Sequence, residues 1–288
     1  MRGKVVVITG SNSGIGRVTA TEIAKMGAQV VMVCRNKDRS EAVRDDINAL
    51  TGLNNCDLFL CDVSSQASVA EFGKAFRAKY DKVDVLVNNA GLMMGAREVN
   101  EAGIEMMMAT NHLGYFLVTH ELLPLLKKSI SARIVNVASI AHRFTNFKSD
   151  DLNAENRRYV SMQQYGLSKL CNILFTNFLA KELTNTNITV NSLHPGNIQS
   201  NFGKTGNGIM SFLIRNFGFV LISPEKGAQT SIFLATSPEV NGKTGLYWYR
   251  KNPVIPSADA INSENARILW EWSLEKTGIK QYGSVANG

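Results

Sequence analysis

The sequence predicts an α/β fold in which a doubly wound parallel sheet of about seven strands carries helices on both faces. Short runs of β-branched residues alternate along the chain with longer amphipathic stretches, each able to hold at least one helix. The runs show little polar alternation, which is typical of strands buried on both faces of a parallel sheet. With 288 residues, 44% of them hydrophobic, and no long Pro/Gly/Ser linker, we expect one domain over 1–288.

Seven apolar runs are the expected strands, and right-handed crossovers are expected to join them. In chain order they are Val5–Thr9, Gln29–Cys34, Cys56–Cys61, Val83–Val87, Arg133–Ala138, Ile188–Leu193 and Gly245–Tyr249. The first run leads into a helical pattern over Arg17–Met26. The final amphipathic pattern places Trp270 and Trp272 against the body of the fold, and Gly278 is expected to stop that helix.

The charge balance bears on possible partners. Lys and Arg number 31 against 24 Asp and Glu, a net charge of +7. Such an excess is compatible with nucleic acid, an acidic membrane surface or a phosphorylated ligand. The basic pairs Lys127-Lys128 and Arg157-Arg158 are isolated, and Asp45-Asp46 and Asp150-Asp151 interrupt the field. We therefore expect no nucleic-acid partner.

The termini and the cysteines favour a cytoplasmic protein. The start of the chain has no apolar stretch typical of a signal peptide or anchor, and no run reaches 18 apolar residues. The cysteines lack CxxC spacing, so we expect buried free thiols in a reducing compartment; they are Cys34, Cys56, Cys61 and Cys171. The histidines lack metal-ligand spacing, so we expect no metal site.

A glycine-rich turn follows the first expected strand. Gly10 permits a tight turn, Gly14 lets a pyrophosphate approach the backbone, and Gly16 allows close packing of the helix on the strand. Free N–H groups at the helix start then bind phosphate. The turn also contains Asn12, Ser13 and Ile15, which we assign to the same site. This arrangement predicts a dinucleotide-binding Rossmann fold.

The end of the second expected strand favours NADP over NAD. An NAD site places a carboxylate about 20 residues after the glycines, on the ribose 2′-OH. Here the chain reads Cys34-Arg35-Asn36-Lys37, with no carboxylate before Asp38. Arg35 can form a bidentate pair with a 2′-phosphate and stack on adenine. Lys37 and Arg39 add positive charge near the expected 2′-phosphate, and we place Asn36 in the same site. We therefore expect NADPH to be preferred over NADH.

A tyrosine and a lysine form a candidate catalytic pair. Tyr165 and Lys169 are four residues apart, so both project from one face of a predicted helix. A nearby ammonium favours phenolate, so we expect a lowered tyrosine pKa and general acid or base chemistry at a carbonyl or alcohol. Ser139 follows the run Arg133–Ala138, at the strand end where ligands of open α/β sheets bind. Its hydroxyl is expected to hold the substrate oxygen.

The ordered set of these motifs resembles the short-chain dehydrogenase/reductase family over nearly the whole chain. The motifs are the glycine turn, Asp62-Val63, Asn88-Asn89-Ala90-Gly91, Asn111, Ser139, Tyr165/Lys169 and His194-Pro195-Gly196. The resemblance implies a catalytic tetrad of Asn111, Ser139, Tyr165 and Lys169, in which the asparagine holds a water and the lysine also binds the nicotinamide ribose. It further implies cofactor contacts from Asp62, Val63, Asn89, Ala90, Gly91, Pro195, Gly196 and Ile198. On this basis 1–140 mainly binds cofactor, and 139–288 carries the catalytic helix, the substrate loop and the C-terminal segment.

Within the family, the chain is similar to the retinol-dehydrogenase-like branch, which also contains the WW-domain-containing oxidoreductase. The similarity lies in the long Ser139–Tyr165 interval, Val33–Asn36, Leu193–Gly196 and the tail Asn265–Trp270. It implies NADP-dependent interconversion of a carbonyl and an alcohol, as reduction of an apolar ketone or aldehyde with retinoids as one class, and a homo-oligomer as one possible state. We find neither the branch's common N-terminal anchor nor WW modules in this sequence.

Two other functions use the same motifs. One is a non-catalytic cofactor-binding sensor or scaffold, which would not need the complete set Asn111, Ser139, Tyr165 and Lys169. The other is a nucleotide-sugar epimerase or dehydratase, whose larger C-terminal substrate domain does not fit the sequence beyond His194. The reductase therefore remains the favoured interpretation.

One apolar segment and one histidine admit several interpretations. Ile209–Ile222 is too short to span a bilayer and contains Arg215-Asn216. It is compatible with a buried helix, a lid over the substrate or a peripheral membrane or subunit contact, and our hypothesis is that it lines an apolar substrate site. His142 lies three residues after Ser139, and we expect it to be a partly exposed loop residue.

Overall fold

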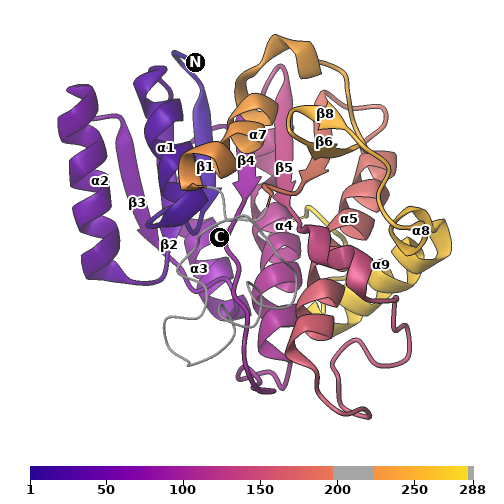
Figure 1. Cartoon of the computed structure of the whole chain (residues 1–288). Coiled ribbons are helices and arrows are strands. Elements are labelled where there is room, and N and C mark those ends of the chain that lie inside the picture. The colour runs from indigo at the N-terminus through magenta and orange to yellow at the C-terminus, as the bar shows by residue number, and fades with distance from the viewer. Residues whose placement is uncertain (197–222, 285–288) are drawn as a thin grey trace.

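Eight strands form one sheet in the order β3-β2-β1-β4-β5-β6-β7-β8 (Figure 1). The computed structural model describes residues 1–196 and 223–284. Strands β1 to β7 pair in parallel, and only β8 runs antiparallel to its neighbour β7. The predicted doubly wound parallel sheet is therefore confirmed, and β8 is a short antiparallel edge beyond the expected strands.

The strands largely follow the apolar runs. Their bounds are β1 Val5–Thr9, β2 Gln29–Cys34, β3 Cys56–Leu60, β4 Val85–Asn88, β5 Ala132–Val137, β6 Ile188–Leu193, β7 Tyr247–Tyr249 and β8 Asn252–Pro253. The limits of β1, β2 and β6 agree with the prediction. β7 begins two residues later than expected, after Gly245 in a left-handed conformation with φ of 72°. β4 is shifted toward the polar Asn88, which apolar patterning leaves out.

Helices occupy the segments between strands. The α-helices are α1 Gly14–Lys25, α2 Lys37–Thr51, α3 Gln66–Lys79, α4 Gly114–Leu126, α5 Ser161–Glu182, α7 Pro224–Thr236, α8 Ala258–Ile261 and α9 Ser263–Thr277. A π-helical segment η1 spans Met108–Leu113, and 3-10 segments η2 and η3 span Ile140–Phe144 and Pro238–Val240. α1 starts at Gly14, earlier than the predicted Arg17, because the glycine turn already forms its first turn.

Apolar side chains on opposite faces of the sheet build two cores. Val6 and Ile8 of β1 pack with residues of α1, α2 and α7, whereas Val7 packs with residues of α3, α4 and α5. This two-sided burial explains why β1 is apolar at successive positions. Trp270 and Trp272 of α9 pack against core clusters, as predicted. Gly278 ends α9 in a left-handed conformation, also as predicted.

A ladder of buried side-chain amides and hydroxyls crosses the centre of the sheet. Asn88 of β4 and Asn136 of β5 are register partners, and Asn88 Nδ2 donates to Asn136 Oδ1 over 2.9 Å. Asn88 Nδ2 also donates to Thr119 Oγ1 of α4, and Asn136 Nδ2 donates to Thr176 Oγ1 of α5. The ladder therefore joins two strands to the two helices that carry residues near the predicted site.

Several expectations concern the chain as a whole. All four cysteines are buried, as predicted. No helix in the described ranges has the length and apolar character needed to cross a bilayer. Ile198 and the segment Ile209–Ile222, with its three interpretations, lie outside the described residues.

Candidate active site

Ser139 lies directly after β5, where the chain turns into η2. It is the N-cap of η2, and its Oγ accepts a hydrogen bond from the Ala141 N–H over 3.2 Å. Since that contact uses an acceptor lone pair, the hydroxyl proton remains available for another oxygen. The serine therefore stands near the carboxyl end of a central strand, where the sequence placed it, and its hydroxyl can donate to a neighbouring oxygen.

Tyr165 and Lys169 come from the first three turns of α5. A side-chain hydrogen bond joins the Tyr165 phenol to Ser139. The Lys169 Nζ is buried, donates to the Val137 carbonyl over 3.0 Å and lies 5.9 Å from the centre of the Tyr165 ring. Helix α5 packs closely on η2 because Gly166 has no side chain: a Cβ there would lie 2.6 Å from the Ala141 carbonyl oxygen. Three of the four predicted catalytic residues are thus together.

The pKa of Tyr165 is raised, whereas we expected it to be lowered. Burial raises the pKa of Tyr165 to about 12, and its hydrogen bond with Ser139 only partly offsets this. Burial lowers the pKa of Lys169 to about 7. Desolvation thus opposes the charge of both groups, and the expected lowering of the tyrosine pKa by the neighbouring lysine is not observed. The tyrosine is therefore a protonated phenol at neutral pH, which suits a proton donor.

Asn111, the fourth predicted residue, is fully buried in the π-helical segment η1. Its Oδ1 accepts from the Leu92 N–H over 2.8 Å, and its Nδ2 donates to the Leu92 carbonyl and to Ser168 Oγ, each over 2.9 Å. The side chain thereby clamps the turn after β4 onto α5. A π-bulge in a helix is frequent at functional sites. The structure brings Asn111 beside the pair through Ser168, and its predicted water-holding role stays a prediction.

The glycine turn has the shape expected for phosphate binding. Gly10 has φ of 65° and Gly14 φ of 51°, both in the left-handed region. A Cβ on Gly14 would meet no atom within 4 Å, whereas a Cβ on Gly16 would lie 2.4 Å from the Gly10 carbonyl oxygen. Ser13 caps α1 without a side-chain hydrogen bond, and Ile15 is half-buried. The space above Gly14 and the helix N–H groups fit a dinucleotide phosphate.

The turn after β4 is fixed to the end of β1. The Thr9 hydroxyl accepts from the N–H groups of Asn89 and Ala90, each over 2.9 Å. Asn89 Nδ2 donates back to the carbonyls of Thr9 and Gly10. A Cβ on Gly91 would lie 3.2 Å from Lys169 Nζ. The predicted segment Asn89–Gly91 therefore lines the space between the glycine turn and the lysine. Thr9 was missed by the sequence reasoning, because a threonine that ends a strand carries no motif signal.

The proposed 2′-phosphate region lies at the end of β2. Arg35 is exposed, and its Nη1 lies 3.2 Å from the Asp62 carboxylate. Burial opposes the charge of Asp62, but hydrogen bonds from Ser64 and Arg35 hold its pKa below the ordinary value. Val63 beside it is buried. Arg35 and Asp62 are therefore brought together, although the ion pair occupies part of the guanidinium.

Two side chains brace this region. Asn36 caps α2 by accepting from the Arg39 N–H over 2.9 Å, and Asn12 Nδ2 donates to Ser40 Oγ over the same distance. The Ser40 hydroxyl donates to the Asn36 carbonyl over 2.5 Å. Asn12 and Asn36 thus lock the glycine turn to the start of α2.

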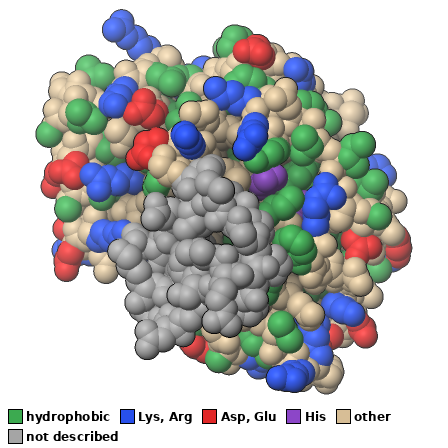
Figure 2. All heavy atoms as spheres, viewed as in Figure 1, with side chains coloured by type: hydrophobic (Ala, Val, Ile, Leu, Met, Phe, Trp, Pro, Cys, Tyr) green, Lys and Arg blue, Asp and Glu red, His purple; other side chains and the backbone are tan. Residues whose placement is uncertain are grey.

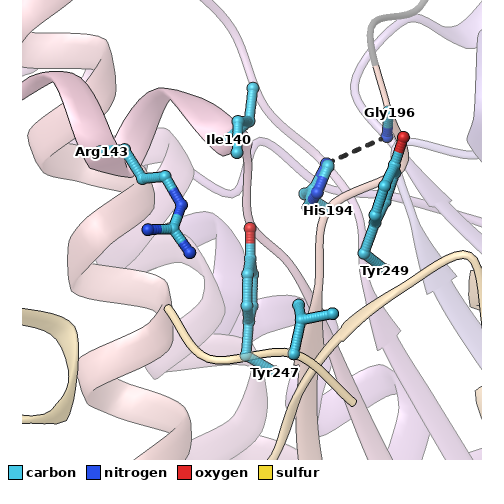
Figure 3. Close-up of a pocket in the computed structure, with 7 residues that line it drawn as sticks. Ile140, Arg143, His194, Gly196, Tyr247 and Tyr249 are labelled. Carbon is cyan, nitrogen blue, oxygen red and sulfur yellow. Dashed lines mark hydrogen bonds between the residues drawn. The ribbon is translucent and has the colours of Figure 1, made fainter. Parts of the chain in front are cut away.

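A pocket of about 280 Å³ opens between the ends of β5, β6 and β7, and we call it the aromatic pocket (Figure 3). Among the described residues it is lined by Ile140, Arg143, His194, Gly196, Tyr247, Tyr249 and Val254. Ile140 follows Ser139 in sequence, and Gly196 belongs to the segment predicted to cover the nicotinamide. His194 Nδ1 accepts from the Gly196 N–H over 3.2 Å, so the histidine holds the start of that segment. Pro195 is the residue between them.

His142 is fully buried, so the expectation of a partly exposed loop residue was wrong. Its Nδ1 lies 2.7 Å from the Ser139 carbonyl oxygen, and its Nε2 accepts from the Ser257 N–H over 3.1 Å. The partner Ser257 is 115 residues away in sequence, which no local pattern could reveal. The histidine ties the loop of Ser139 to the segment after β8.

A buried carboxylate outside every motif supports the same site. Glu105 is fully buried and accepts from the N–H groups of Met107 and Met108 at the start of η1. It also accepts from the Tyr159 hydroxyl over 2.9 Å and from Gln164 Nε2 over 3.0 Å. Because Gln164 precedes Tyr165, the carboxylate joins the helix of Asn111 to the helix of the tyrosine. Its burial depends on these donors, which the sequence does not show.

Comparisons with known proteins agree with this arrangement. The family model described as short chain dehydrogenase matches residues 4–207. Retinol dehydrogenase 11 from Homo sapiens is 39% identical over 277 residues, which are 96% of this chain and 86% of that protein. The crystal structure of an uncharacterized protein from Mycobacterium paratuberculosis has a TM-score of 0.79 and 29% identity, and the match covers 99% of this chain and 96% of that one.

A further solved structure contains a cofactor. The Pseudomonas aeruginosa RhlG/NADP active-site complex is 26% identical, with a TM-score of 0.68 over 92% of this chain and 97% of that one. The family model and the retinol dehydrogenases each cover most of the chain. The chain therefore belongs to the short-chain dehydrogenase/reductase family, in its retinol-dehydrogenase-like branch, and is an oxidoreductase with a nicotinamide cofactor.

Proposed function

We propose that the protein is an NADP-dependent reductase of aldehydes or ketones with a largely apolar body, in which Tyr165 donates the proton. The observation that carries this proposal is the hydrogen-bonded pair of Ser139 and Tyr165, with Lys169 Nζ 5.9 Å from the tyrosine ring. A hydroxyl donor, a protonated phenol and an amine around one point match the needs of a carbonyl oxygen that becomes an alkoxide and then an alcohol.

Each residue has a separate task in this reaction. Ser139, whose Oγ already accepts from Ala141, donates its proton to the substrate carbonyl and orients it. Tyr165, protonated at neutral pH, gives its proton to the developing alkoxide. Lys169 adds positive charge beside the phenol and favours the resulting phenolate. The glycine turn and Arg35 would hold NADPH, which would supply the hydride for the carbonyl carbon.

The cofactor preference is supported by the end of β2. Arg35 is exposed there, no carboxylate occupies 35–37, and Asn36 is used in capping α2. A guanidinium at this position favours the 2′-phosphate of NADP, which an NAD-type carboxylate would repel. The NADP complex of RhlG supports the same choice. The open space at Gly14, where a Cβ would meet no atom within 4 Å, leaves room for the pyrophosphate.

The substrate class and setting are extensions of the same proposal. The retinol dehydrogenases among the relatives support an apolar carbonyl compound, with retinal as one candidate. Four buried thiols support work in a reducing compartment, the cytoplasm.

The test is the variant Tyr165→Phe in a panel of aldehydes, ketones, quinones and retinal, with oxidation of NADPH as the readout. Because phenylalanine keeps the ring and loses only the hydroxyl group that donates the proton, turnover should fall by about 100-fold to 10,000-fold. Fluorescence titration should show NADPH binding within about threefold of wild type. A Tyr165→Phe enzyme that retains full turnover, or a wild-type protein that reduces no carbonyl of the panel, refutes the proposal.

A further inference from the structure

The aromatic pocket is lined by a row of three rings, in which His194 lies between Tyr247 and Tyr249 (Figure 3). The rings of His194 and Tyr249 are 4.1 Å apart at an interplanar angle of 12°, and His194 stacks on Tyr247 at 5.7 Å and 25°. Ile140 and Val254 add aliphatic surface. Aromatic faces of this kind bind flat rings in offset stacks. At about 280 Å³ the pocket lies at the lower end of ligand sites, which fits one or two rings better than a long chain.

Positive charge stands at this row of rings without a carboxylate beside it. Arg143 lines the pocket, and the Arg250 guanidinium lies 5.0 Å from the centre of the Tyr249 ring. No Asp or Glu among residues 1–196 and 223–284 comes within 4.0 Å of either guanidinium. By sequence, residues 197–222 contain no Asp or Glu at all. Figure 2 shows a histidine among apolar side chains with Lys and Arg side chains nearby.

The positive charges of Arg143 and Arg250 affect the ionisation of His194. Burial, with smaller contributions from His142, Arg143 and Arg250, lowers the pKa of His194 to about 4. His194 is therefore neutral, and the charge of the pocket comes from the arginines. An apolar pocket with an unpaired cation attracts a ligand that carries both a ring and an anion.

Arg143 is already oriented for such a ligand. Its Nη2 donates to the Ile255 carbonyl, which fixes the guanidinium beside the pocket. In Figure 3 the side chain extends from η2 toward Tyr247, with His194 and Tyr249 beyond that ring. A guanidinium held by one bond loses little further entropy when its other N–H groups bind a carboxylate.

We propose that the aromatic pocket is the outer part of the substrate site and selects ring-bearing carbonyl compounds with a carboxylate, which pairs with Arg143. The inference rests on the proposed reductase function and narrows its substrate. The ligand ring packs against His194 on the side away from Tyr249, the carboxylate meets the guanidinium, and the carbonyl extends toward Ser139, the residue before Ile140. Retinal and other uncharged carbonyl compounds would then be weaker substrates than anionic ones.

The test uses two aldehydes that differ only in charge, 4-formylbenzoate and its methyl ester, with NADPH. In the wild-type enzyme, kcat/KM should be at least tenfold higher for the anion. Arg143→Gln should reduce the ratio of kcat/KM for the acid over the ester by about 10-fold to 100-fold, the effect of losing one charge-assisted pair. The matched control is Arg250→Gln, which removes the same charge beside the pocket and should change the ratio by less than about threefold.

Each other outcome overturns the inference. A wild-type ratio near one shows that the pocket does not select charge. Equal losses for acid and ester in Arg143→Gln show that the arginine only holds the segment of Ile255. Equal effects of Arg143→Gln and Arg250→Gln show a diffuse field without a contact. In all three cases the proposed function still stands if the wild-type enzyme reduces the ester and the Tyr165→Phe variant does not. If neither aldehyde is reduced, the inference fails, and the wider carbonyl panel decides the proposed function.

Discussion

The ring of His142 bridges the Ser139 carbonyl, 2.7 Å from Nδ1, and the Ser257 N–H, 3.1 Å from Nε2. Because a backbone N–H can only donate, Nε2 is the acceptor and Nδ1 carries the proton toward Ser139. Burial lowers the pKa of this histidine to about 4, so the ring stays neutral at pH 7. One neutral tautomer thus fixes the backbone of the serine that we assign to the carbonyl.

Two substitutions at His142 should show how much the hydrogen bond to the Ser139 carbonyl contributes to catalysis. In His142→Asn the amide can still donate near the place of Nδ1, whereas His142→Leu has no donor for the Ser139 carbonyl. We expect kcat to fall by about 10-fold to 100-fold in His142→Leu, because a small misplacement of an orienting group has effects of this size. His142→Asn should recover most of that loss, with the KM for NADPH unchanged in both. Equal kcat values in the two variants would show that His142 acts only on stability.

Arg35 should determine cofactor choice. Arg35→Ser removes the guanidinium that we assign to the 2′-phosphate, so the KM for NADPH should rise by about 10-fold to 100-fold while that for NADH stays within about threefold. Steady-state kinetics with both cofactors measure this. Arg44→Ser on α2 is the control, since Arg44 pairs with its neighbour Asp45. A parallel rise for both cofactors in Arg35→Ser would contradict the assignment.

Glu105 should contribute strongly to the stability of the fold, although it belongs to no sequence motif. Glu105→Ala leaves two backbone N–H groups and the Tyr159 hydroxyl buried without their acceptor. Each such group has a cost of about 1 to 3 kcal/mol, so we expect a loss of about 3 kcal/mol or more in the free energy of unfolding. Tyr159→Phe removes one donor and should lose about 1 kcal/mol. Urea denaturation compares them, and equal losses would count against the role of Glu105.

Lys169 should make the stability of the cofactor-free protein depend on pH. Its pKa is about 7 in the fold against 10.5 in the unfolded chain, so the unfolded chain binds more protons between these values. Its contribution to the free energy of unfolding therefore rises with pH, by about 2 kcal/mol from pH 7 to 9. Buried thiols such as Cys56, whose pKa burial raises to about 12, act oppositely.

The experiment therefore compares the pH dependence of stability in wild type and in Lys169→Met, because both proteins have the same buried thiols. Wild type should gain about 2 kcal/mol more than Lys169→Met between pH 7 and 9, as measured from urea midpoints. Identical pH profiles would show that the lysine remains charged in the fold.

The sequence predicted what depends on local pattern. The β-branched runs identified the strands, and the glycine spacing located a turn whose φ values are left-handed at Gly10 and Gly14. It did not predict β8, since two residues carry no periodicity, nor the raised pKa of Tyr165, since desolvation depends on packing. The roles of His142 and Glu105 could not be predicted, because important partners of both lie far away in sequence. Ser257, for example, is 115 residues from His142.

The amide ladder of Asn88 and Asn136 has a consequence for the folding of the sheet. Strands such as β4 and β5 are apolar on both faces, so hydrophobicity alone would tolerate a slip of one strand along the other. A slip of one residue would separate Asn88 from Asn136 and break the hydrogen bond between them, which leaves the Asn136 Oδ1 without its donor in the interior, where unpaired polar groups are costly. The ladder therefore specifies a unique alignment of the central strands, and with it the alignment of Ser139 against the turn at Asn89.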